Sequence, residues 1–349
     1  MHVRTPEERY LSQFQERSDP QISSSAHPFT IYPDNASTST GSSEVTLQGS
    51  FSGRLCIPSS LADQPCRSLD LDSLLYQLND IMGTTYPLTE PIAIHLQECI
   101  TRNDDFGTAY ARLRPHWYSD FATLQIKIEE AEANDKRARS EALNETKDQI
   151  INVEIPPRRV WDLYSNRVIP RWWAAPPHEP QKKGKLVVPV SHAWVEIGAR
   201  VDISTSINSH LWPVPVPSDS SLERVRIELL NLDLEYVWLD VLCLRQRGDP
   251  ENEEIRLEEW TLDVPTIGHV YRQDPWDDRV VVYFNGLGRP FRIQNLDGER
   301  HWLNRAWTVQ EAGHDMIIGG QTPTSPTAVE QRNSNRDYQR FYQRMDIAK

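Results

Sequence analysis

Apolar positions follow a helical period in the first half of this chain. They recur every three or four residues over 71–82, which predicts a helix with Gly83 as its C-cap. The same spacing predicts a helix near 92–100 and another that starts at Trp117 and runs into the charged segment 127–147. Interleaved charges of this kind are typical of a solvated helix face. This part of the chain is therefore predicted to be helical.

Short apolar runs alternate with helical patterns further along. Runs with the length of buried strands lie at 186–190, 236–244, 280–284 and 316–318. Helical patterns lie between them, at 218–232, 255–271 and 300–312. The run at 236–244 is interrupted only by Asp240, as expected of a central strand that is buried on both faces. The order predicts an α/β fold, with a doubly wound, mainly parallel sheet and right-handed crossovers.

Composition sets the expected domain boundaries. Residues 1–52 are rich in Ser, Thr, Pro and Gln, and we predict disorder because they cannot bury enough apolar area to offset the entropy of ordering. Residues 53–150 are the helical N-terminal region, and 151–185 form a connector rich in Pro and Trp that we expect to pack across the next unit. The α/β domain spans 186–320, and 321–349 form a polar tail.

Charge and cysteine content narrow the expected partners. The net charge of −13 makes a nucleic acid or an anionic membrane an unexpected partner. The four cysteines form no Cys-x-x-Cys pair, so neither a zinc ribbon nor a thioredoxin motif is expected. The sequence has no signal-peptide core and no window long enough to span a membrane. We therefore expect a cytoplasmic protein without a membrane span.

Polar side chains stand where the predicted strands end. Ser191 and His192 follow the first run, and Asp240 and Cys243 lie near the end of the second. Ligands of α/β sheets bind beyond the carboxyl ends of the strands. A buried carboxylate needs a partner, so Asp240 either binds a ligand or holds Ser191, His192 or a backbone amide.

Other chemistry at these strand ends is less favoured. Consecutive side chains on a strand point to opposite faces, so Ser191 and His192 do not form a nucleophile–base pair. A protease dyad of Cys243 with His192 is disfavoured because buried cysteines are usually inert. Metal binding by His192, Cys243 and Asp240 is disfavoured further.

Four segments resemble, in sequence and in order, the fungal heterokaryon-incompatibility (HET) domain: Ser191-His192-Ala193-Trp194, 236–246, 270–271 and 305–312. The resemblance covers roughly 186–320, and the chain departs from it at the insertion 212–215 and at Pro265. It implies a TIR-like, flavodoxin-like fold. It also implies a role in non-self recognition (allorecognition) and programmed cell death. The implied partner is a second copy of the chain or a sensor protein.

The resemblance also implies a reaction. Enzymatic TIR domains cleave the nicotinamide–ribose bond of NAD with a helical glutamate, often four residues after a tryptophan, and Trp307 and Glu311 have this spacing. Residues four apart share a helix face, and a carboxylate beside a ribose can stabilise an oxocarbenium-like transition state. Glu311 is thus the candidate catalytic residue, and NAD is a substrate, with no cofactor or metal expected. The candidate substrate-binding residues are Ser191, His192, Trp194, Asp240, Cys243 and Trp307.

Two alternatives remain open at this point. In the first, Glu311 is a solvated residue or a structural partner of Arg300, Arg305 or His192, and Trp307 is part of the core. In the second, the whole domain is a non-enzymatic module that signals by self-association.

Overall fold

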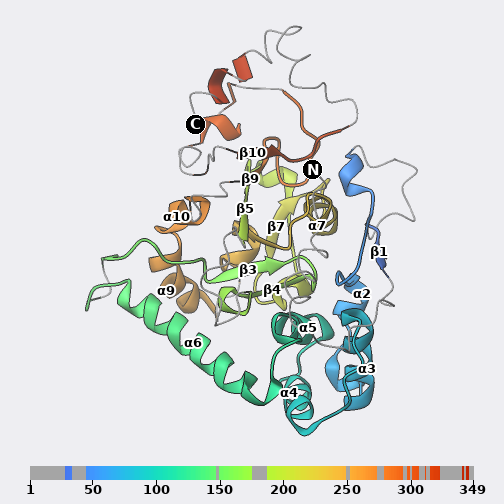
Figure 1. Cartoon of the computed structure of the whole chain (residues 1–349). Coiled ribbons are helices and arrows are strands. Elements are labelled where there is room, and N and C mark those ends of the chain that lie inside the picture. The colour runs from blue at the N-terminus through green and yellow to red at the C-terminus, as the bar shows by residue number, and fades with distance from the viewer. Residues whose placement is uncertain are drawn as a thin grey trace.

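A six-stranded, mostly parallel sheet lies at the centre of the molecule, with helices on both of its sides (Figure 1). The chain therefore has a mixed α/β fold. The computed structural model describes residues 28–33, 45–146, 149–174, 187–248, 252–272, 279–293, 297–298, 301–305, 311, 315–322, 340–341 and 343–345.

The strands of the sheet follow the order β10-β9-β5-β8-β3-β4. Its parallel part consists of β5 (Val187–His192), β8 (Tyr236–Leu239), β9 (Arg279–Tyr283) and β10 (Asp315–Ile318). From β5 the chain passes to β8 on one side and later to β9 on the other, so the strand order reverses at β5. The apolar runs at these four positions thus predicted strands of the central sheet.

The strand β5 is buried along its whole length although it contains a proline. Pro189 is registered with Trp238 of β8, while the register with β9 begins one residue later, at Val190. A proline removes one backbone donor and is tolerated best where a strand is not paired on both sides. Pro189 therefore lies just before the doubly paired part of β5.

The run 236–244 is not a single strand. The strand β8 ends at Leu239, and α8 (Asp240–Cys243) follows as one helical turn. The turn is stabilised by Asp240, whose Oδ1 accepts from the Val241 N–H at 2.7 Å. The apolar pattern continues because Val241, Leu242 and Cys243 are buried in helical rather than extended conformation. Asp240 is consequently not in mid-strand but at the carboxyl end of β8.

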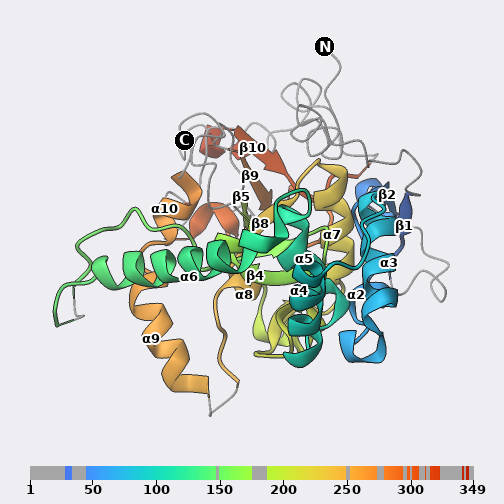
Figure 2. The same cartoon turned by 60° about the horizontal axis from the view of Figure 1, so that its bottom comes forward.

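The helical region contains α2 (Ser59–Ala62), α3 (Leu71–Met82), α4 (Glu90–Thr101), α5 (Phe106–Leu113) and α6 (Leu124–Glu141) (Figure 2). The bounds of α3 confirm the prediction, with Gly83 in the left-handed conformation at φ 66°. α5 was not predicted, and α6 begins at Leu124 rather than at Trp117. Short 3₁₀ turns are η2 (Cys66–Ser68), η3 (Arg114–His116), η4 (Phe121–Thr123), η5 (Arg171–Trp173), η6 (Ile197–Ala199) and η7 (Ser206–Asn208).

The structure places two parts of 1–52 in the fold, unlike the expected disorder. The strands β1 (Phe29–Ile31) and β2 (Phe51–Gly53) form an antiparallel pair, and η1 (Thr46–Gln48) lies between them in sequence. The Gln48 amide is buried and donates to Glu228 Oε2 at 2.8 Å and to the Gly288 carbonyl at 3.0 Å. The rest of 1–52 lies outside the described residues.

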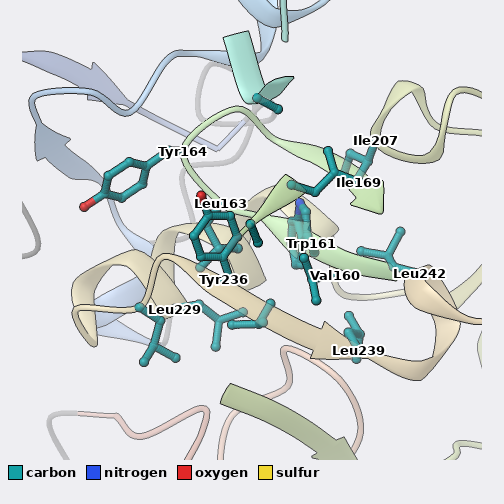
Figure 3. Packing of buried hydrophobic residues seen from close by; sticks show 14 of the residues in the cluster. Val160, Trp161, Leu163, Tyr164, Ile169, Ile207, Leu229, Tyr236, Leu239 and Leu242 are labelled. Carbon is teal, nitrogen blue, oxygen red and sulfur yellow. The ribbon is translucent and has the colours of Figure 1, made fainter. Parts of the chain in front are cut away.

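The connector supplies two strands of the central sheet. β3 (Arg159–Asp162) pairs antiparallel with β8 and with β4 (Arg167–Pro170), which forms one end of the strand order. Figure 3 shows Trp161 of β3 beside the buried side chains of the neighbouring elements, Tyr236 and Leu242 among them. One cluster of buried apolar residues runs from the helical region through the connector into the sheet.

Helices α7 (Leu222–Asn231) and α10 (Ile267–Arg272) lie on opposite sides of the sheet (Figure 1). α9 (Glu253–Asp263) precedes α10, and Pro265 separates the two, as its restriction on helices predicts. β6 (Arg200–Ile203) and β7 (Val214–Pro217) form a separate antiparallel pair. Over the described part of the chain, no helix is long and apolar enough to cross a bilayer.

Candidate functional site

The candidate site is built on the carboxyl end of β5, where the strand order reverses. In α/β sheets this position forms a crevice between the loops that follow the two neighbouring strands. Ser191 and His192 are the last residues of β5, and their side chains point to opposite faces of the sheet. The site therefore has two halves, one around each of these residues.

Ser191 contacts the candidate catalytic carboxylate. Its Oγ lies 2.5 Å from Glu311 Oε2, and it accepts a hydrogen bond from Trp302 Nε1 at 2.6 Å. Glu311 is only 8% exposed, and its burial raises the pKa of the carboxyl group. The Ser191 hydrogen bond and the charge of Arg305 act in the opposite direction. The structure thus brings together Glu311 and Ser191, which are 120 positions apart in sequence.

His192 forms an ion pair with Asp240. Its Nε2 lies 2.9 Å from Asp240 Oδ1, and its Nδ1 lies 3.3 Å from the Ala193 carbonyl. Burial favours the neutral imidazole, but the charge and hydrogen bond of Asp240 outweigh it and raise the pKa of His192. Burial likewise opposes the ionised form of Asp240, but His192 holds its pKa below the usual value. Both ring nitrogens face acceptors, as suits an imidazolium.

Arg305 lies between the two halves of the site. Its Nη1 donates to the His192 carbonyl at 2.5 Å. Its charge lowers the pKa of both Glu311 and Asp240. Arg305 itself is partly exposed. A cation here favours an anionic group of a ligand.

The predicted helix 300–312 differs from the structure at its start. Trp302–Asn304 form the 3₁₀ turn η9, and Arg305 is extended, with φ −83° and ψ 141°. Glu311 itself has a helical backbone. Trp307, the tryptophan expected beside Glu311, lies outside the described residues. Among the described residues, the indole that contacts the Ser191–Glu311 pair is that of Trp302.

Trp194 and Cys243 have different surroundings. Trp194 is partly exposed, with its ring centroid 5.5 Å from that of His192 and 5.5 Å from Cζ of Arg200. Cys243 is 1% exposed, and burial raises the pKa of its thiol to about 12. A thiol with this pKa is protonated at neutral pH, so Cys243 is neither a nucleophile nor a group that a ligand reaches.

Sequence reasoning did not assign Trp302 or Tyr271 to the site. The Tyr271 hydroxyl donates to the Val190 carbonyl at 3.5 Å, and Ser191 is among the groups that influence its ionisation. Burial and the charge of Glu311 raise its pKa well above the usual value. The segment 270–271 does belong to the family resemblance, so the signal for Tyr271 was present. Trp302 has no such signal, since its partner on β5 is 111 positions away.

Replacing Asp240 by Asn tests the ion pair through its pH dependence. The raised pKa of His192 adds stability that is complete below about pH 6.5 and is lost as the pH rises through the folded-state pKa. The lowered pKa of Asp240 adds stability above about pH 3.9, which is lost as the pH falls through its folded-state value. We therefore expect Asp240→Asn to lower the free energy of unfolding most between these limits, by about 2 kcal/mol near pH 5.5.

Urea denaturation at pH 5.5 and pH 9 measures this difference. The loss is expected to shrink at pH 9, and the exposed Asp202→Asn should show no such trend. An equal loss at both pH values would mean that His192 is neutral in the folded protein.

Comparison of the chain with models of known families, with curated proteins and with solved structures finds no match. Within the described residues, no group of three His, Cys, Asp or Glu side chains could hold a metal ion. A polar hollow of about 440 Å³ lies elsewhere in the fold, and none of its residues belongs to the site above. It is lined by Asp63, Asp105, Ser204, Thr205, Ser206, Ser209 and His210.

Proposed function

We propose that this chain is a HET-type effector of non-self recognition and cell death that hydrolyses the nicotinamide–ribose bond of NAD, with Glu311 as the catalytic carboxylate. The observation that carries the proposal is the position of Glu311, which is held by Ser191 at the carboxyl end of the strand where the order reverses. Ligands of open α/β sheets bind at this position.

The strand order supports a doubly wound, TIR-like fold within the α/β class. Counted from β5 as the first parallel strand, the neighbours β8, β5, β9 and β10 stand in the order 2-1-3-4. This is the order of flavodoxin-like folds, whose ligand site lies between the first and third strands. Here these strands are β5 and β9, and the helices α7 and α10 lie on opposite sides of them.

The reaction requires negative charge beside the ribose. Cleavage of the bond between ribose C1′ and the nicotinamide nitrogen returns the bonding electron pair to nicotinamide, and positive charge develops on the sugar ring. An ionised Glu311 stabilises that charge, and a water molecule then adds to C1′. The products are nicotinamide, ADP-ribose and one proton.

Groups around Glu311 suit the rest of the substrate. The charges of Arg305, Asp240 and His192 all act on Glu311, and Arg305 faces the anionic pyrophosphate in this proposal. Trp194 is partly exposed beside His192, and in this proposal its aromatic ring contacts a flat base of the substrate. Asp240 positions His192 and does not take part in the chemistry.

A second candidate function is a self-associating module without enzymatic activity. The observation that favours it is the exposure of apolar side chains around the β6–β7 pair. Ile197 is 71% exposed, and Val201 and Leu211 are each 45% exposed. Exposed apolar side chains that gather on one unit are typical of interaction surfaces.

An assay of nicotinamide release separates the two functions. The purified chain is incubated with NAD at low and at high protein concentration, and nicotinamide is measured by chromatography. We expect release that depends on the chain. Its absence at every concentration, together with a concentration-dependent increase in mass that Ile197→Ser and Val201→Ser abolish, would overturn the enzymatic function in favour of the module.

A further inference from the structure

Trp302 stands at one end of a chain of three hydrogen-bonded groups. Its Nε1 lies 2.6 Å from Ser191 Oγ, which in turn lies 2.5 Å from Glu311 Oε2. Trp302 is completely buried and Ser191 is 1% exposed, so water does not compete for these contacts. The three residues come from η9, from the end of β5 and from the segment that follows η9.

The direction of the first hydrogen bond is fixed by chemistry. An indole N–H only donates, so the Ser191 oxygen must accept from Trp302. The serine oxygen then has one lone pair and its own hydrogen for its other neighbours, Glu311 and Tyr271. A hydroxyl that accepts a hydrogen bond is polarised and becomes a better donor. The short contact with Glu311 has the length of an O–H donor facing a carboxylate.

The indole is itself held in one orientation. The ring of Phe284, directly after β9, meets the Trp302 ring edge to face, with centroids 5.0 Å apart and planes at 73°. Phe341 packs on Phe284 in the same way, with centroids 5.0 Å apart. This aromatic packing favours a single position of the N–H.

We propose that Trp302 is a positioning residue that, by donating to Ser191, directs the serine hydroxyl at Glu311 and keeps this buried carboxyl group ionised. The proposal rests on the proposed function for its catalytic consequence, because only an ionised Glu311 stabilises positive charge on the ribose. The hydrogen-bond chain itself is independent of what the site binds.

The charged and titratable groups that face Glu311 also affect its ionisation, together with the hydrogen bonds from Trp302 to Ser191 and from Ser191 to Glu311. Burial and the charge of Asp240 on α8 favour the protonated acid. Ser191, Arg305 and His192 favour the ionised form. Tyr271 of α10, itself protonated at neutral pH, adds no charge. Removal of the Trp302 N–H therefore weakens the Ser191 hydrogen bond, one of the few contributions that keep Glu311 ionised against the effect of burial.

The test replaces Trp302 by Phe, which retains a ring against Phe284 but lacks the N–H. The protein carries ¹³C-labelled glutamate, and the Glu311 carboxyl resonance, assigned from its loss in Glu311→Gln, is titrated by NMR. We expect the pKa of Glu311 to rise by about one unit in Trp302→Phe, the shift that corresponds to one hydrogen bond. Trp172→Phe, which removes an indole N–H outside this chain of groups, should leave the pKa unchanged.

A second measurement does not depend on the Trp302 variant. In Ser191→Ala, the Trp302 indole N–H resonance is expected to move upfield and the pKa of Glu311 to rise. A Glu311 pKa that is the same in wild type, Trp302→Phe and Ser191→Ala would overturn the proposal.

The outcomes distinguish this proposal from the proposed function. A higher Glu311 pKa in Trp302→Phe, found in a protein that releases no nicotinamide, would leave the positioning role intact and refute NAD hydrolysis. Where release occurs, Trp302→Phe is expected to move the acidic limb of the rate profile to higher pH and to regain the wild-type rate at alkaline pH. If Trp302→Phe lowers the rate but the acidic limb of the rate profile stays at the wild-type pH, the positioning role is refuted and the enzymatic function stands.

Discussion

Nicotinamide release is expected to fall by a factor on the order of 10²–10⁴ when Glu311 is replaced by Gln. Glutamine has nearly the same volume as glutamate. Its amide oxygen can accept from Ser191 Oγ in place of Glu311 Oε2, which lies 2.5 Å from that hydroxyl. It lacks the negative charge that stabilises a cationic ribose. The loss is therefore expected in the chemical step and is measured under single-turnover conditions, with protein in excess over NAD.

Two controls limit the interpretation of this loss. Glu258→Gln changes an exposed glutamate of α9 by the same chemistry and is expected to leave release unchanged. The thermal unfolding of Glu311→Gln should remain close to that of the wild type. Full activity of Glu311→Gln would show that the carboxylate is only a buried partner of Ser191.

The second large effect concerns stability. Arg114→Met is expected to lower the free energy of unfolding by about 3–5 kcal/mol, as is typical when one member of a buried ion pair is removed. Arg114 and Asp162 are both completely buried, and Nη2 of Arg114 donates to Asp162 Oδ1 at 2.9 Å. The same guanidinium donates to the Tyr236 hydroxyl at 2.7 Å and also to Glu235. Its loss leaves the Asp162 carboxylate buried without a cation.

Urea denaturation measures this effect, and two further variants define its origin. Arg137→Met removes an exposed arginine of α6 and should change stability by less than about 0.5 kcal/mol. The double variant Arg114→Met with Asp162→Asn should recover part of the loss, because the uncompensated charge is gone. If the double variant loses as much as the two single ones combined, the cost lies in packing and not in charge.

Local patterns predicted much of the fold because their cause is local. The helix over 71–82 has apolar positions at helical spacing, Asp70 in the N-cap position and Gly83 where a left-handed residue is required. The strands of the parallel sheet follow from short apolar runs bounded by polar segments. In each case the residues that determine the element lie within it.

Predictions based on apolar runs were wrong where two conformations bury the same residues. The run that begins at Tyr236 stays buried in β8 and in α8, so its apolar pattern does not mark the change at Asp240. The antiparallel addition of β3 to β8 involves segments some 75 positions apart, Trp161 and Val237. No periodicity within either segment indicates that pairing.

The site was predictable from the ends of β5 and β8, but its details depend on distant residues. Ser191 and His192 were expected at a strand end, and the α/β order places strand ends together. The partners of these residues were not all expected, because Trp302 reaches Ser191 through the irregular segment around η9. A helix predicted over 300–312 would place that indole elsewhere.

The segment around Gln48 bears on where the folded body begins. Glu228, on the buried side of α7, accepts from Gln48, from the Tyr283 hydroxyl and from the Gly320 N–H. The Asn231 amide in turn donates to the carbonyls of Leu47 and Ser50. A recombinant fragment that begins after residue 52, the boundary that composition suggests, would lack Gln48, which donates to Glu228. It would also lack the residues that bind Asn231 of α7. Fragments intended for crystallisation or spectroscopy should accordingly start upstream of Val45.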